Sequence, residues 1–122
     1  MLKPIPARIL KHSATLKVPK TIDAWDKVTS YTDYALHRVC VQPSNKTVKS
    51  KDNTDITLNG IMFYDCRMSS PRNLDIKALK NQSDAIDGDI KLVFGSETFT
   101  VQIVETLYDD TGLYHHTEVG LI

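Results

Sequence analysis

Four histidines are the residues of this 122-residue chain that could bind a metal ion or transfer protons. His115 and His116 are adjacent, so in a strand we expect their side chains to point to opposite faces, where they cannot easily share one ion. His12 and His37 lie in other predicted strands, and no H-x-x-x-H or Cys/His cluster supports them. The spacing therefore predicts no metal site and favours partly exposed strand histidines.

Carboxylates and nucleophiles are similarly unsupported. Asp109 and Asp110 resemble the carboxylate pair of a hydrolase, but they stand at a predicted turn, where Asp is favoured for local hydrogen bonding. Cys66, Ser69 and Ser70 have no flanking motif that would activate a nucleophile. The chain also lacks a glycine-rich phosphate loop. We therefore predict no catalytic residue and no cofactor, and expect a protein that is not an enzyme.

The cysteines and the N-terminus indicate the compartment. Cys40 and Cys66 lie far apart without metal-ligand spacing, which favours two buried thiols in a reducing compartment. The N-terminus lacks the apolar segment of a signal peptide, and no run is long enough to predict a transmembrane helix. We expect synthesis in the cytoplasm and no membrane association.

The formal net charge of zero hides an uneven distribution. Residues 1–51 carry a net charge of +7 and residues 52–122 a net charge of −7. Within one domain the halves either cancel or form opposite patches through which identical copies associate head to tail. Lys46, Lys49 and Lys51 lie on a polar excursion, which indicates either a solvated loop or edge, or a loop that contacts DNA phosphates without sequence preference.

The strongest structural signal lies in residues 90–103. Two segments in which apolar and polar residues alternate flank Gly95-Ser96. Glycine at the first central position allows the positive φ that a type II′ turn requires. This turn places the apolar side chains of both strands on one face, in agreement with the hydrophobic pattern. The predicted pairs are Phe94–Glu97, Leu92–Phe99 and Ile90–Val101.

A second reversal is predicted at Asp110-Thr111-Gly112, as a three-residue loop with a bulge. Its register directs Thr117, Val119 and Leu121 into the core, together with Leu113. Residues 90–121 should therefore form a three-stranded antiparallel meander. The predicted pairs across this turn are Ile103–Val119 and Val101–Leu121.

Upstream, further strands are predicted at residues 14–18, 36–41 and 56–64, the last bent or bulged at Asn59-Gly60. The polar stretches between them should be loops, with a short helix in the last from Asp75 to Ala85. Those stretches are residues 19–34, 44–55 and 68–89. Together these features predict one all-β domain of residues 1–122: a small antiparallel β-barrel or sandwich of about six strands, with long loops and at most one short helix.

Several segments resemble minor capsid proteins of tailed phages and prophages of Gram-positive bacteria. The resemblance covers most of the chain in order and is weakest across residues 19–34 and 68–86. It rests on family signatures rather than on chemical motifs. The segments that carry it are Lys3–Pro6, Ile9–Leu16, Val41–Ser44, Phe63–Arg67, Leu107–Asp110, Leu113–His116 and Glu118–Ile122.

The resemblance implies a head-completion protein, similar to the connector or stopper subunits added beneath the portal after DNA packaging. Such proteins form rings, commonly dodecamers, around the DNA exit channel of the virion. Expected partners are further copies of the chain, the portal or adaptor ring, tail proteins and, without sequence preference, channel DNA. On this interpretation the channel loop carries Lys46, Lys49 and Lys51. The candidate subunit interface comprises Tyr108, Tyr114, His116 and Glu118.

An alternative is a small β-barrel module that binds single-stranded nucleic acid or a peptide. Such a module needs exposed aromatic side chains beside basic residues. Phe63, Phe94 and Phe99 are predicted to be buried, whereas the tyrosines predicted to be exposed, Tyr64, Tyr108 and Tyr114, lie in the acidic half. The pattern therefore favours the connector.

Overall fold

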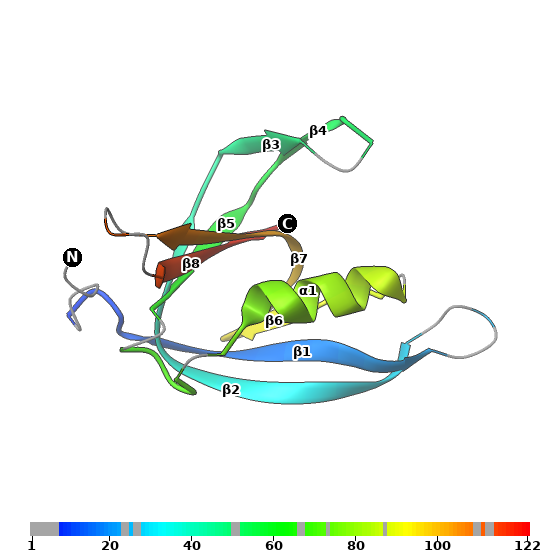
Figure 1. The fold of residues 1–122 in the computed structure, drawn as a ribbon, viewed down its shortest axis with the longest axis horizontal. Helices are drawn as coiled ribbons and strands as arrows, with labels where there is room; N and C mark the ends of the chain where they lie inside the picture. The colour runs from blue at the N-terminus through cyan, green and yellow to red at the C-terminus, as the bar shows by residue number, and fades with distance from the viewer. Residues whose placement is uncertain are drawn as a thin grey trace.

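The computed structural model of the chain describes residues 8–22, 25, 28–49, 52–65, 68–72, 74–86, 88–108, 111 and 114–122. Strands dominate it, and the described part contains one short helix (Figure 1). The predicted all-β class is confirmed. In chain order the elements are β1 (His12–Ile22), β2 (Val28–Pro43), β3 (Thr47–Lys49), β4 (Asp55–Thr57), β5 (Gly60–Tyr64), α1 (Ile76–Ala85), β6 (Lys91–Phe94), β7 (Glu97–Tyr108) and β8 (Tyr114–Leu121).

Six strands close into an antiparallel barrel in the order β1-β2-β5-β8-β7-β6. Closure occurs where Thr15–Lys17 of β1 pair with Lys91–Val93 of β6. Inward-facing side chains fill the interior, as in other small barrels. Those with a relative exposure of 2% or less include Leu16, Leu36, Met62, Tyr64, Leu92, Val101, Val104, Val119 and Leu121.

The hairpin of β6 and β7 forms as predicted. Gly95 has a backbone φ of 61°, a value that residues other than glycine rarely adopt. Because the turn and the apolar pattern specify the same register, sequence was sufficient to predict it. The confirmed contacts are Phe94 with Glu97, Leu92 with Phe99, and the hydrogen bond from the Val101 N–H to the Ile90 carbonyl at 2.9 Å.

The pairing of β7 with β8 differs from the prediction at one point. Val101 lies opposite Leu121 as expected, but Ile103 lies opposite Gly120, so the predicted Ile103–Val119 pair is wrong. The register shifts between Val101 and Ile103 because a β-bulge adds one residue to β7. Val104, which is 1% exposed, consequently takes the core position that Ile103 was expected to fill.

The predicted loop at residues 19–34 is also wrong. β1 continues to Ile22 and β2 begins at Val28, and Thr21 pairs with Ser30. We call residues 19–22 and 28–34 the arm. It projects beyond the barrel because β6 pairs only with residues 15–17 of β1, and β5 pairs with β2 only from Cys40 onward (Figure 1). A two-stranded arm lacks one continuous buried face, so its sequence shows no clean period of two.

β3 and β4 form a separate two-stranded ribbon, in which Val48 pairs with Ile56. The ribbon stands away from the barrel in Figure 1. The excursion at residues 44–55 is therefore partly strand. The predicted bend in residues 56–64 is confirmed, because β4 ends at Thr57 and β5 begins at Gly60. At this bend Leu58 is 2% exposed and packs over Gly120, which holds the base of the ribbon on the barrel.

The short helix predicted from Asp75 to Ala85 is confirmed as α1. Asp75 caps it, since its carboxylate accepts a hydrogen bond from the Ala78 N–H at 3.0 Å. Ile76 is 1% exposed and joins the barrel core. The Lys77 ammonium donates to the Val104 carbonyl at 3.0 Å. Because β6 is short, α1 covers the space between β7 and β1 that a longer strand would have filled.

Candidate interaction surfaces

Two histidines support strand ends rather than a chemical site. The Val41 N–H donates to His12 Nδ1 at 3.0 Å, and the His12 ring meets Phe94 edge-on with centroids 5.0 Å apart. His37 Nδ1 lies 3.1 Å from Ser13 Oγ. Each ring is therefore engaged by its own neighbours. Cys40 is a buried free thiol, as predicted.

The other two histidines meet directly, which corrects the expectation that they point to opposite faces. Their Nδ1 atoms are 2.6 Å apart, so one ring donates a hydrogen bond and the other accepts it. His116 pairs with Leu107 and Tyr114 with Tyr108, so His115 is the extra residue of a bulge that re-aims its side chain. Within the described residues, no three His, Cys, Asp or Glu side chains are grouped to hold a metal ion.

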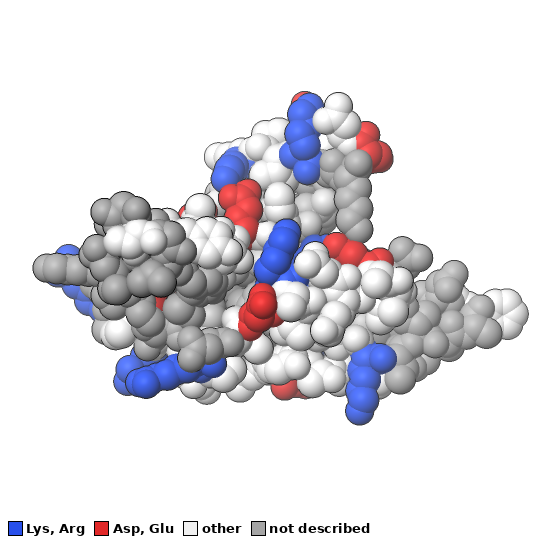
Figure 2. All heavy atoms as spheres, viewed as in Figure 1, with Lys and Arg blue, Asp and Glu red and all other residues white. Residues whose placement is uncertain are grey.

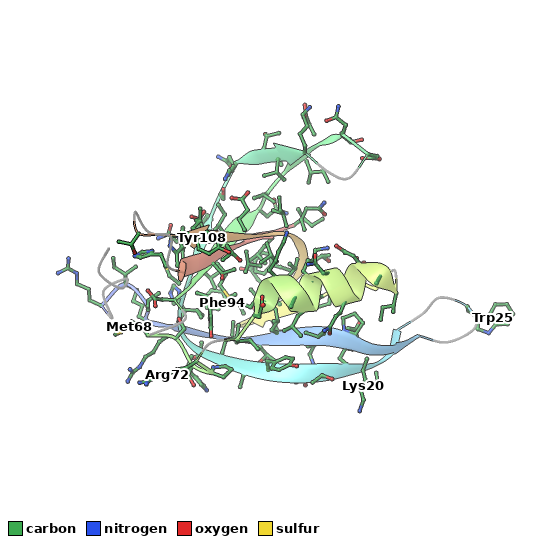
Figure 3. All side chains as sticks on the ribbon, viewed as in Figure 1. Lys20, Trp25, Met68, Arg72, Phe94 and Tyr108 are labelled. Carbon is green, nitrogen blue, oxygen red and sulfur yellow. The ribbon has the colours of Figure 1, made fainter. Side chains whose placement is uncertain are left out.

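The candidate subunit interface lies on the wall formed by β7 and β8. Tyr108 is 62% exposed (Figure 3), whereas the side chain of Tyr114 lies outside the described residues. His116 Nε2 and Glu118 Oε2 are 3.0 Å apart, and their side chains are only 17% and 25% exposed. Two of the four predicted residues thus contact each other. Glu105 lies directly opposite Glu118. Like charges in directly opposed positions repel each other, and this repulsion destabilises the pairing of β7 with β8.

The predicted channel lysines lie on or beside the ribbon. Lys49 Nζ is 2.5 Å from Asp55 Oδ1, and both side chains are more than 60% exposed. Lys46 lines a shallow hollow beneath the ribbon together with Glu105 and Glu118. Lys51 lies outside the described residues, as do Asp109, Asp110 and Cys66. Lys46 therefore lies above Glu105 and Glu118 on the wall formed by β7 and β8, whereas Lys49 is paired with Asp55.

Charges of both signs are interspersed on the face shown in Figure 2. A hollow of about 560 Å³ between the ribbon, α1 and β7 illustrates this mixture, because Lys49, Lys77 and Lys80 line it together with three aspartates. Lys80 is bound to Asp84 at 2.6 Å within this hollow. Because the three lysines are balanced by three aspartates, the lining of this hollow does not form an anion-binding site. The opposite charges of the two chain halves are therefore partly cancelled around the hollow that the ribbon shares with α1 and β7.

A second hollow, of about 310 Å³, lies where β2 ends, β5 begins and β6 turns into β7. Its walls are largely apolar and include Val41, Pro43, Phe94 and Phe99, with Glu97 at the rim. Both phenylalanines are only partly buried, although the sequence predicted them as core. We call this site the barrel-end hollow.

Sequence alone did not mark the most exposed aromatic side chain among the residues that the structure describes. Trp25 is 82% exposed and lies at the far end of the arm (Figure 3). It is the single tryptophan of the chain, in a stretch whose sequence predicts a loop. A single tryptophan in a stretch without an apolar period, with Asp23 and Asp26 nearby, was the signal that could have marked this position as a contact point.

Comparison with known proteins provides no relative: no protein-family model, curated protein or solved structure matches the chain. Among the described residues, no helix has the length and apolar character needed to cross a membrane.

Proposed function

We propose that this protein is a structural head-completion subunit of a tailed phage, a head–tail connector that forms a ring below the portal around the DNA exit channel. The resemblance to minor capsid proteins supports this assignment. The structural observation that supports it best is a barrel with a filled interior and two β-structures, the arm and the ribbon, that project from it (Figure 1).

The filled interior favours a protein that acts through its outer surface. Leu16, Met62 and Leu92 are fully buried at the centre of the barrel. A barrel that encloses a small ligand instead leaves a cavity lined by such side chains. The hydrogen-bonded histidines at the strand ends likewise have structural partners. Contact with other macromolecules is therefore the role that this barrel serves best.

The two projections favour assembly. A two-stranded β-structure is marginally stable in water and presents unpaired backbone edges. Contacts with neighbouring subunits would stabilise the arm and the ribbon and cover those edges. Each copy would then place the same projection at the same position in a ring, as head-to-tail association of identical chains requires.

We place the ribbon, with Lys46 and Lys49, against the channel DNA. Many weak phosphate contacts without base recognition suit a channel through which DNA must pass. The Lys49–Asp55 pair is exposed, so it contributes little to stability and can open to meet a phosphate. The ribbon is thus a candidate for contact with DNA rather than for tight binding.

The binding-module alternative is less well supported. A single-stranded nucleic-acid binder stacks successive bases on aromatic side chains along one groove. Among the residues whose side chains the structure describes, the exposed aromatic ones are Trp25, Tyr31 and Tyr108, which instead lie on the arm and on the far end of β7. They do not form one stacking surface.

Deletion of the gene from a phage or prophage tests the proposal. We expect heads that package DNA but neither retain it nor join tails, and we expect the purified protein, supplied in trans, to restore both. Light scattering and electron microscopy of the protein with isolated portal should reveal a ring. Normal virions from the deletion strain would overturn the proposal, as would a chain that stays monomeric with portal and binds single-stranded oligonucleotides.

A further inference from the structure

Trp25 is placed for contact with another molecule. At 82% exposure it presents most of its ring to solvent at the end of the arm, well away from the barrel (Figure 3). A buried tryptophan contributes a large apolar area, and tryptophan is enriched among the residues that dominate protein–protein binding.

The barrel-end hollow has matching properties. Val41, Pro43, Phe94 and Phe99 give it mainly apolar walls, beside the polar side chains of Gln42 and Asn59. Its volume of about 310 Å³ is at the lower end for sites that enclose a small organic group. Partly exposed phenylalanines in such a hollow are able to pack against an aromatic ring.

The arm and the hollow of one molecule cannot meet. Val93 pairs with Thr15, so Phe94 lies level with the beginning of β1, whereas Trp25 follows the end of that strand. The extended chain from Ala14 to Ile22 spans roughly 26 Å. In Figure 3 Phe94 and Trp25 lie on opposite sides of α1. An indole in the hollow must therefore come from a second molecule.

The sequence around Trp25 carries charges of both signs, Lys20 and Lys27 with Asp23 and Asp26. Of these, Lys20 offers a charge that complements the hollow of a second copy of this chain. Lys20 is exposed on the arm and extends into solvent (Figure 3). Glu97 is the one ionisable residue among those that line the barrel-end hollow, and it is exposed at the rim. An arm that inserts Trp25 could bring Lys20 toward Glu97, and such opposite charges orient an encounter between partners.

We propose that Trp25 of one copy inserts into the barrel-end hollow of the next copy. Because the projecting part and the receiving part are at different ends of the molecule, the contact is head-to-tail and repeats from copy to copy, which builds a ring when the rotation between copies closes. The inference deepens the proposed function and rests on self-association, and it names the surface through which the ring forms. It places the principal contact on the arm rather than on the β7–β8 wall.

The single tryptophan makes the contact directly measurable, since all tryptophan fluorescence of this chain comes from Trp25 and the emission of portal alone can be subtracted. Dilute protein is compared with protein assembled at high concentration or on isolated portal, and the mass of each sample is determined by light scattering. We expect the emission to move to shorter wavelength on assembly. Trp25→Ala should raise the concentration required for assembly at least about tenfold.

Two variants separate this contact from a general loss of apolar surface. Ile86→Ala removes another exposed apolar side chain, 43% exposed after α1, and should assemble normally. Gln42→Tyr adds a ring to an exposed residue that lines the hollow, and should block insertion without altering the core. Thermal unfolding by circular dichroism checks that both variants fold.

Mixing provides the sharpest test. Trp25→Ala retains an intact hollow, and Gln42→Tyr retains an intact arm. Neither variant should assemble alone, but a mixture should form one-to-one pairs that grow no further, and the emission of Gln42→Tyr should shift only when Trp25→Ala is added. Lys20→Glu and Glu97→Lys should each weaken assembly, and their combination in one chain should restore it.

The outcomes distinguish the inference from the proposed function. Assembly with unchanged tryptophan emission, or assembly that is lost in Tyr108→Ala and retained in Trp25→Ala, would overturn the inference and leave the ring intact. An emission shift that appears only on binding portal, without self-association, would also overturn it. A chain that assembles under neither condition would overturn both.

Discussion

The backbone N–H of Leu74 donates a hydrogen bond to the hydroxyl of Tyr64 at 2.9 Å. The prediction that Tyr64 is exposed is wrong, because its ring is fully buried in the barrel core, and the same hydroxyl donates to the carbonyl of Pro71. A single core side chain thus ties the segment after β5 to the barrel. Ser69 adds a second tie, since its hydroxyl donates to the carbonyl of Arg38 at 2.6 Å.

Tyr64→Phe should destabilise the domain by about 1 to 2 kcal/mol, because the ring stays packed while the N–H of Leu74 and the carbonyl of Pro71 lose their partner. Urea denaturation followed by circular dichroism measures the change. Tyr31→Phe is the matched control, because Tyr31 is 37% exposed, and its free energy of unfolding should remain unchanged. Equal stability of the two variants would contradict the proposed role of the hydroxyl.

Gly120→Ala should destabilise the domain by about 1 to 3 kcal/mol through overpacking. A Cβ at this position would lie 2.7 Å from Ile103 Cγ2 and 2.9 Å from Leu58 Cδ1. Gly95→Asn serves as the control, because nothing lies within 4 Å of a Cβ there and Asn tolerates a positive φ. If Gly120→Ala is as stable as the original chain, Leu58 does not anchor the ribbon base as described.

Val101→Asp should prevent folding, because it places an unpaired carboxylate at a position that is 2% exposed opposite Leu121. The expected signs are loss of the cooperative thermal transition and recovery in the insoluble fraction. Thr98→Asp, in the same strand but exposed, should fold normally. A soluble and cooperatively folded Val101→Asp would show that β7 does not face the core in this register.

Charge reversal of Lys46, Lys49 and Lys51 should leave folding intact. The free energy of unfolding should change by less than about 1 kcal/mol for the Lys49–Asp55 pair, because exposed ion pairs contribute little to stability. In assembled heads the same change should impair DNA retention. A DNase-protection assay on purified heads measures it. Substitution of the three lysines by arginine, which keeps the charge, is the control, and equal protection by both variants would exclude a channel role.

The sequence was sufficient to predict an element where its turn or cap residues and its apolar pattern indicated the same structure. Gly95 and the alternation on both sides of it predicted the β6–β7 hairpin with its register, and the pattern around Asp75 predicted α1. Both elements depend on contacts between residues close in sequence. The bend before Gly60 was also predictable from the sequence, because a glycine within a strand pattern indicates a local irregularity.

Non-local contacts explain the errors. The bulge at Gln102 has no marker in the sequence, so Ile103 was assigned the core position that Val104 occupies. The arm was overlooked because only one partner strand supports it. The meeting of His115 with His116 depends on a bulge in β8 and was likewise not predictable from alternation.

The sequence by itself determined that the chain is an all-β domain, where its final hairpin turns, and that no recognised catalytic motif is present, because residue type and spacing encode these features locally. Only the tertiary structure decided how β6 returns to β1 to close the barrel, that Lys46 lies above Glu105 and Glu118, and that Trp25 and the barrel-end hollow lie apart. Those relationships join residues far apart in the chain, and they arise only when the strands pack around a common core.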